Sequence, residues 1–250
     1  MGPEMRYQAA LFDMFDTLVN FRTVHLPLVR VDGREVRSSS PFVYEVLKPF
    51  CPTVSFEEFF QAFVGSYRAA EQIRNTERRE VTAHERFRML FHRLNIPDGP
   101  QAADLIEAGI AEHMRQLALA MEFPESHRIL LGGLRSRYQM GVISNFDHGP
   151  TVQKALAAQG IRDWFKAVVV SADIGWRKPR CEIFLEAFRM MGIGPADAIF
   201  VGDTPEVDVL GAQAVGMDVI WIDDGTKTLP AGSPSPTYTV KSLVEIERIL

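Results

Sequence analysis

The sequence of 250 residues predicts an α/β fold, a parallel sheet core whose first strand is followed by a long helical insertion. Two observations predict the sheet: apolar runs alternate with amphipathic helical segments over residues 124–250, and a separate apolar run occupies residues 8–12. Strands that alternate with helices form parallel, doubly wound sheets with right-handed crossovers. The insertion is predicted because residues 41–119 show helical spacing and are too many for an ordinary crossover. We therefore expect a core of residues 1–19 and 124–250 and a helical cap of residues 20–123.

Composition excludes several classes of protein. Hydrophobic residues make up 46% and charged residues 24%, which is ordinary for a globular protein. The net charge of −5 argues against a nucleic-acid partner, and no run of about 18 apolar residues predicts a membrane span. The first six residues form no signal-peptide core, so we expect a cytoplasmic protein with Cys51 and Cys181 reduced. The six histidines are scattered, which argues against a zinc or iron site, and the sequence leaves monomer and homodimer both open.

The chain begins with the strand at residues 8–12 and continues into the expected cap. A small β-hairpin is expected near residues 28–37, because the strands alternate and Asp-Gly at its centre suits a type I′ turn. Ser55 and Glu58 form a capping-box pattern at the start of a helix whose aromatic residues recur at helical spacing and predict cap core. Three arginines further along the chain (Arg74, Arg78 and Arg79) are expected on a solvated face. Two further helices are predicted at residues 82–94 and 101–119.

Beyond residue 124 the helices and strands alternate to the end of the chain. The predicted helices of this part are residues 125–137, 149–159, 181–191, 207–214 and 242–250. The predicted strands are residues 140–143, 167–170, 198–201, 218–222 and a short one at 238–240.

Polar residues follow the strands of the predicted sheet. Because parallel strands have their carboxyl ends at one edge, the side chains that follow them share that edge, where open α/β sheets bind ligands. The residues expected there are Asp13, Asp16, Thr17, Ser144, Asn145, Lys178, Asp203 and Asp208. The sequence therefore predicts a polar, strongly acidic site.

The charges at this edge predict a metal ion. Two like charges about 4 Å apart repel by roughly 4 kcal/mol at an effective dielectric constant of about 20. Lys178 alone does not offset the carboxylates of Asp13, Asp203 and Asp208, whereas a hard divalent cation such as Mg²⁺ does. The cation and Lys178 together favour a small anionic substrate, and Ser144 with the amides at the start of a helix adds donors suited to phosphate.

These segments, taken together, resemble the four motifs of the haloacid dehalogenase-like hydrolase superfamily, in its subfamily I with a helical cap after the first motif. The four matching segments, in order, are residues 13–18, 144–147, 175–184 and 201–217. The resemblance covers essentially the whole chain. It implies a Rossmann-like core and a cap whose closure excludes water and selects the substrate.

The resemblance also implies a mechanism. Asp13 would attack the substrate and form an aspartyl-phosphate, while Ser144 and Lys178 hold the transferring group. Thr17 would position the nucleophile loop and Asn145 would order the loop of the second motif. The implied Mg²⁺ ligands are Asp13, the backbone carbonyl of Phe15, Asp203 and Asp208. The function expected from this is Mg²⁺-dependent hydrolysis of a small phosphomonoester.

One position departs from that pattern. Most phosphatases of the superfamily carry a second aspartate two residues after the nucleophile as general acid and base, and here that position is Phe15. Asp16 lies one residue later and is expected to order the loop. Dehalogenases of the superfamily also have an aromatic residue there, but usually lack the paired acids of the fourth motif. Two alternatives stay open: a 2-haloacid dehalogenase that uses Asp13 without metal, and a catalytically weak phosphate-binding protein.

Overall fold

The computed structural model describes residues 6–31 and 33–250, so the predicted hairpin turn residue Asp32 and the first five residues lie outside the described chain. The chain forms two compact units. The core unit comprises the chain up to Asn20 together with Phe123–Leu250, and the inserted unit comprises Phe21–Glu122.

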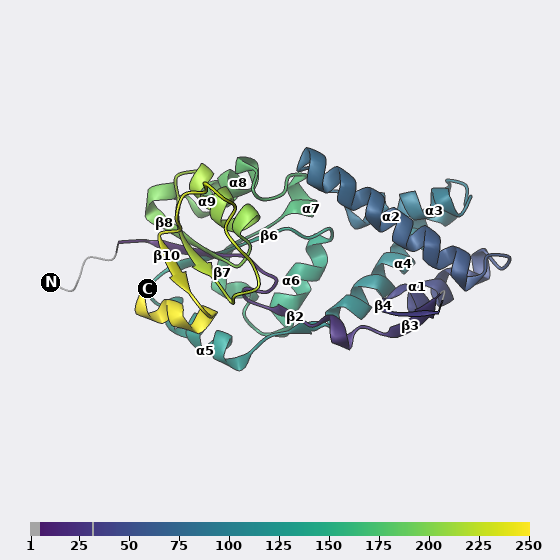
Figure 1. Cartoon of the computed structure of the whole chain (residues 1–250), viewed down its shortest axis with the longest axis horizontal. Coiled ribbons are helices and arrows are strands. Elements are labelled where there is room, and N and C mark those ends of the chain that lie inside the picture. Colours follow the sequence, from purple (N-terminus) through teal and green to yellow (C-terminus); the bar gives the residue numbers. More distant parts are fainter. Residues whose placement is uncertain (1–5, 32) are drawn as a thin grey trace. The chain divides into compact units, whose positions relative to one another are not determined.

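The core unit is built on a sheet of six parallel strands in the order β10-β9-β8-β1-β6-β7 (Figure 1). The strands are β1 (Ala9–Phe12), β6 (Gln139–Ser144), β7 (Phe165–Val170), β8 (Ala198–Gly202), β9 (Asp218–Ile222) and β10 (Tyr238–Val240). The first strand is central, because Leu11 pairs with Gly141 on one side and with Phe200 on the other. This arrangement confirms the predicted α/β fold with its parallel sheet.

Helices cover both faces of this sheet. Figure 1 shows α8 and α9 over one face and α5 with the C-terminal segment over the other. Phe184 of α8 packs edge-on against Phe200 of the sheet, with ring centroids 5.4 Å apart, within a buried apolar cluster. The core helices are α5 (Glu125–Leu134), α6 (Gly149–Ala158), α7 (Ser171–Ile174), α8 (Cys181–Met191) and α9 (Leu210–Ala214). Short 3₁₀ segments occupy Arg162–Trp164, Pro195–Asp197 and Leu243–Arg248.

Two of the predicted core helices are wrong in detail. The helix expected at residues 207–214 is a π-helical turn, Pro205–Val209, followed by the short α9. The wide turn allows a side chain within it to fold back on the preceding backbone, as described below. The last helix, expected at residues 242–250, is a 3₁₀ segment.

The inserted unit is mainly helical. Its helices are α1 (Ser40–Leu47), α2 (Phe56–Glu77), α3 (Ala83–Arg93) and α4 (Pro100–Ala118), with 3₁₀ segments at Thr23–His25 and Lys48–Phe50. Its strands form the hairpin of β3 (Leu28–Val31) and β4 (Arg34–Arg37) and the short pair of β2 (Asn20–Phe21) and β5 (Met121–Glu122), which the sequence did not reveal. The capping box of Ser55 and Glu58 begins α2, and Thr82 with Glu85 begins α3 in the same way.

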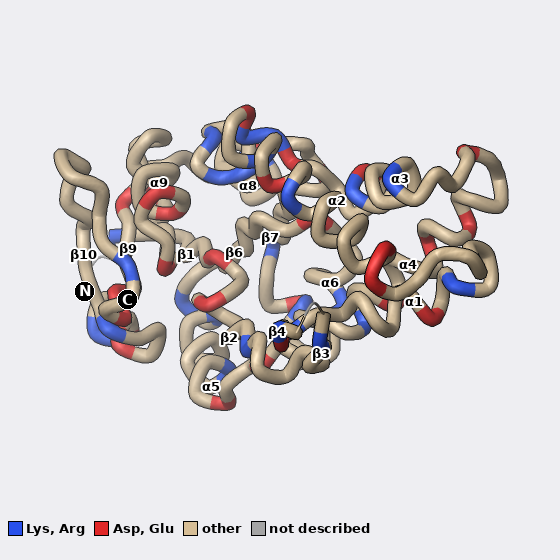
Figure 2. Tube along the Cα trace, turned by 45° about the vertical axis from the view of Figure 1, so that its right-hand side comes forward, with Lys and Arg blue, Asp and Glu red and all other residues tan. Residues whose placement is uncertain are grey.

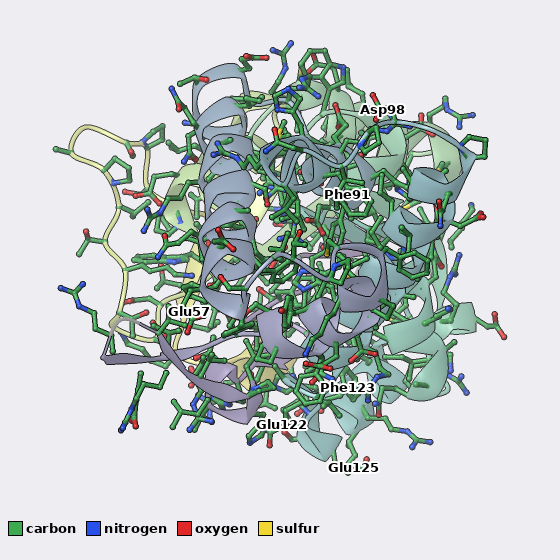
Figure 3. All side chains as sticks on the ribbon, turned by 90° about the vertical axis from the view of Figure 1, so that its right-hand side faces the viewer. Glu57, Phe91, Asp98, Glu122, Phe123 and Glu125 are labelled. Atoms are coloured by element: carbon green, nitrogen blue, oxygen red, sulfur yellow. The ribbon has the colours of Figure 1, made fainter. Side chains whose placement is uncertain are left out.

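Aromatic residues of α2 and α3 form much of the inserted unit's interior. Phe59 and Phe63 stack at 5.9 Å, and Phe91 lies among the interior side chains while Glu57 and Asp98 lie at the margin (Figure 3). The expected solvated face is wrong for Arg74, which is buried and donates to Glu80 at 2.8 Å. A buried guanidinium needs such a partner to offset its desolvation.

Charged residues of both signs are interspersed along the described part of the chain (Figure 2). Among the described residues, no helix combines the length and the apolar character needed to cross a membrane.

Candidate active site

The carboxylate of Asp13 stands directly beyond the central strand β1. Its amide donates to Val201 at 2.9 Å, which continues the ladder with β8, and its side chain is buried. The chain then turns sharply, since Asp16 has φ +60° and its amide donates to Val19 at 2.6 Å. Phe15, between them, packs its ring on Phe146 with centroids 4.8 Å apart. The turn therefore presents Asp13 at the sheet edge and joins the loop after β1 to the loop after β6 through the aromatic pair.

Lys178 is the cation nearest to Asp13. Its Nζ lies 2.5 Å from Asp13 Oδ1 and 2.7 Å from Asp208 Oδ1, and the side chain is buried. Asn145 fixes the backbone of Lys178 from both ends: its Oδ1 accepts from the lysine amide at 2.8 Å, and its Nδ2 donates to the lysine carbonyl at 3.0 Å. Asn145 thus joins the loop after β6 to the loop that carries the lysine, in addition to its expected local role.

Asp208 is held by the turn that begins beyond β8. Its Oδ2 accepts from the amides of Asp203 and Thr204 at 3.1 and 2.9 Å. The side chain lies so close to Gly202 that a Cβ on that glycine would stand 2.5 Å from the Cβ of Asp208. One oxygen of Asp208 therefore closes the turn, and the other faces Lys178.

Ser144 and Thr17 approach the same edge from β6 and from the loop after β1. Ser144 is completely buried, and its Oγ has no hydrogen-bond partner among the described residues. Because buried hydroxyl groups are nearly always paired, this one is suited to a ligand atom. Thr17 Oγ1 lies 3.5 Å from Asp203 Oδ1, so Thr17 reaches across to the loop after β8.

The three carboxylates of Asp13, Asp203 and Asp208 converge, with one oxygen of each within 4.8 Å of the others. Burial raises the pKa of Asp13 to about 7; Lys178 opposes this rise, and Asp208 and Asp203 add to it. Burial and Asp208 also raise the pKa of Asp203. Burial alone would lower the pKa of Lys178, but the carboxylates of Asp13 and Asp208 leave it raised. Burial is thus the main reason why the pKa values of Asp13 and Asp203 are raised, and the neighbouring carboxylates add to it.

Two residues that the sequence analysis missed also contact Asp203. Lys227 Nζ forms an ion pair with Asp203 Oδ2 and lies 3.0 Å from Thr204 Oγ1. Trp221 Nε1 donates to the carbonyl of Asp203 at 3.2 Å. The expectation that a single lysine faces the carboxylates is therefore wrong. The sequence did contain a signal for Lys227, because it follows the strand β9. This strand is parallel to the other strands, so the residues after it reach the same edge of the sheet.

The donor set fits a hard divalent cation. Three converging carboxylate oxygens are the ligand type that Mg²⁺ takes, and their mutual repulsion favours a bound positive charge. Phe15 offers only its backbone carbonyl, because its side chain is an apolar ring packed on Phe146.

Comparison with known proteins identifies a family and two relatives by sequence. A family model described as haloacid dehalogenase-like hydrolase matches residues 53–222. Over 168 residues the chain is 33% identical to the pyrimidine 5′-nucleotidase YjjG of Escherichia coli (strain K12), a match that covers 67% of this chain and 70% of that protein. Over 128 residues it is 36% identical to a glyceraldehyde 3-phosphate phosphatase of Methanothermobacter thermautotrophicus, which covers 50% of this chain and 55% of that protein.

The fold is similar to that of a solved 2-haloacid dehalogenase from Pseudomonas syringae pv. Tomato DC3000. The TM-score is 0.73 over 97% of each chain, at 22% identity. The likeness therefore concerns the arrangement of helices and strands.

Proposed function

Because the chain belongs to the haloacid dehalogenase-like hydrolase family, we propose that it is a Mg²⁺-dependent phosphatase that hydrolyses a small phosphomonoester through an aspartyl-phosphate on Asp13. The observation that carries this proposal is the convergence of the carboxylates of Asp203 and Asp208 on that of Asp13, with Lys178 between Asp13 and Asp208. The curated relatives described above, a nucleotidase and a phosphatase by name, support the same reaction class.

In the first step an oxygen of Asp13 attacks the phosphorus, an Asp–O–P bond forms, and the bond from phosphorus to the alcohol oxygen breaks. The alcohol oxygen leaves with the bonding electron pair and takes a proton from water, because Phe15 offers none. Lys178 and the unpaired hydroxyl of Ser144 are positioned to hold the phosphoryl oxygens and offset their charge. Water then attacks the phosphorus of the aspartyl-phosphate and the bond from Asp13 to phosphorus breaks, which releases inorganic phosphate, restores the carboxylate and returns a proton to the solvent.

The Mg²⁺ ion would be held by Asp13, the Phe15 carbonyl and Asp203. When bound, it would neutralise charge on the carboxylates and on the phosphoryl group. Asp208 would contribute to the metal site directly or through a water molecule, and its two oxygens also contact the turn amides and Lys178. Asn145 would position Lys178, and Thr17 would position Asp203.

The same geometry supports two alternative functions less well. A 2-haloacid dehalogenase would use Asp13 to displace halide from carbon without metal, and the acidic pair Asp203 and Asp208 would then only repel the substrate's carboxylate. A protein that binds phosphate with little turnover fits the loss of a carboxylate at Phe15. It leaves unexplained why the full set of groups for nucleophilic attack is retained.

The test is phosphate release from a panel of phosphomonoesters with Mg²⁺, with EDTA, and with Asp13→Asn as the matched variant. We expect turnover with Mg²⁺, none with EDTA, and a loss of about a thousandfold or more in Asp13→Asn. Halide release from 2-haloacids in EDTA would instead establish the dehalogenase. Binding of a phosphate analogue, with release of neither inorganic phosphate nor halide, would establish the catalytically weak phosphate-binding protein.

A further inference from the structure

Lys227 lies in the loop after β9, outside the four motifs that the family resemblance uses. Its ammonium group contacts Asp203 Oδ2 and Thr204 Oγ1. The side chain of Asp203 is 12% exposed and that of Lys227 is 39% exposed. A largely buried carboxylate is therefore paired with a cation that has open solvent beside it.

The two lysines divide the acidic cluster between them. Lys178 serves Asp13 and Asp208, whereas Asp203 receives its positive charge from Lys227. The Asp203 carboxylate is also a member of the converging set that fits a divalent cation. A metal ion that uses Asp203 would meet the ammonium group at the same carboxylate, and two cations at such short range repel.

The loop around Lys227 is held by its own turns. Asp223 Oδ1 accepts from the amide of Gly225 at 3.0 Å, and Asp224 Oδ1 accepts from the amide of Thr226 at 2.8 Å. Gly225 has φ +85°, which suits the left-handed position of such a turn. The lysine side chain can therefore leave Asp203 by rotation into solvent while the loop backbone stays in place.

We propose that Lys227 is a resident cation that neutralises Asp203 in the metal-free protein and must withdraw before a divalent cation can use that carboxylate. Lys227 thereby sets the Mg²⁺ concentration at which the site fills. The inference rests on the proposed function, because it takes Asp203 as a ligand of the metal. It assigns a role in metal affinity to a residue outside the motif loops.

The test is calorimetric titration of Mg²⁺ into the metal-free protein and its variants. Lys227→Met and Lys227→Gln remove the cation, with the amide of the second variant keeping a donor toward Asp203. Lys241→Met is the matched control, because Lys241 pairs with Asp223 at 2.7 Å on the same side of the fold and its loss changes the net charge equally. We expect the Kd for Mg²⁺ to fall about tenfold in both Lys227 variants and to stay near the wild-type value in Lys241→Met.

A second measurement uses the wild-type protein and needs no variant to fold. An amine-reactive reagent is applied in EDTA and in Mg²⁺, and modification of each lysine is read by peptide mass spectrometry. We expect the labelling of Lys227 to rise several-fold when Mg²⁺ is present, while the labelling of Lys241 stays the same.

The outcomes separate the two proposals. Equal Mg²⁺ affinity in the wild type and both Lys227 variants, with no change in the labelling of Lys227, would overturn the inference and leave the phosphatase proposal intact. Absence of Mg²⁺ binding in the wild type and in every variant would overturn the metal site itself, and the role of Lys227 with it.

Discussion

Phe15 stands two residues after the proposed nucleophile, where a second carboxylate would serve as general acid. Its ring is half-buried against Phe146, and its neighbour Asp16 is exposed in a left-handed backbone conformation. A ring cannot protonate a leaving alcohol, so the proposed reaction favours substrates whose leaving group needs little protonation. The sequence alone revealed this departure, because a residue type is enough to show that a proton donor is missing.

Restoring a carboxylate at this position should restore proton transfer. We expect Phe15→Asp to raise kcat about 10²–10⁴-fold with phosphomonoesters that have poor leaving groups, and far less with good ones. The measurement is kcat for a series of esters of graded leaving-group pKa.

Phe15→Asn is the matched control for this prediction, since it also removes the ring but offers no acid. An equal gain in Phe15→Asn would show that opening the space beside Phe146, and not proton transfer, limits the rate.

The pKa of Asp13 makes the stability of the metal-free protein depend on pH. Burial raises this pKa from 3.8 to about 7, so the folded state binds more protons than the unfolded state between these values. Stability therefore falls as the pH rises through that window. We expect the melting temperature in EDTA to fall between about pH 4 and about pH 7, and to fall less steeply in Asp13→Asn. Parallel pH profiles for the two proteins would contradict this.

At the scale of elements, the segment from β8 through the π-helical turn to α9 builds one side of the site. The turn lets Asp208 reach back to the amides of Asp203 and Thr204, and Gly202 leaves the space that its side chain fills. The sequence predicted a regular helix here, because local spacing carries no sign of a π turn. By contrast, α8 and β9 have the predicted bounds. The end of α8 was predictable because Gly192, which follows it, has the left-handed conformation that a glycine favours.

Gly202→Ala should therefore lower both the stability of the protein and its affinity for Mg²⁺. The added Cβ meets the Asp208 side chain at 2.5 Å, so we expect a loss of about 1–3 kcal/mol in the free energy of unfolding and weaker Mg²⁺ binding. The checks are chemical denaturation and calorimetric titration.

Gly133→Ala in α5 is the matched control, because among the described residues nothing beyond the adjoining backbone of its own helix lies within 4 Å of a Cβ there. An alanine in that helix should stabilise the protein by about 0.5–1 kcal/mol. A Gly202→Ala variant as stable as the wild type would contradict this prediction, because it would show that the turn accommodates the added Cβ without loss of stability.

At the scale of the whole molecule, the inserted unit leaves and re-enters the core through the short strand pair β2 and β5. There the amide of Arg22 donates to the carbonyl of Ala120 at 2.7 Å. The two ends of the insertion are therefore neighbours, while the central strand β1 pairs only with strands of the core unit. We propose that the core unit is an independent folding domain and the inserted unit its cap.

Replacing residues 23–119 by a Gly/Ser linker of about six residues should leave the core folded, since the linker has only a short gap to close. We expect a cooperative thermal transition and the circular dichroism of an α/β sheet. Mg²⁺ binding should persist, because Asp13, Asp203 and Asp208 all lie in the core unit. A chain without a cooperative transition would show that the sheet needs the insertion to fold.

The sequence by itself determined the parallel sheet and the residues that follow its strands. This was possible because hydrophobic periodicity is local, and because parallel strands must end at one edge. Only the tertiary structure decided how the charges are paired. Asn145 fixes Lys178 from 33 residues away, and Lys227 reaches Asp203 across 24 residues. Such contacts depend on where whole loops come to lie, and no local spacing in the chain records them.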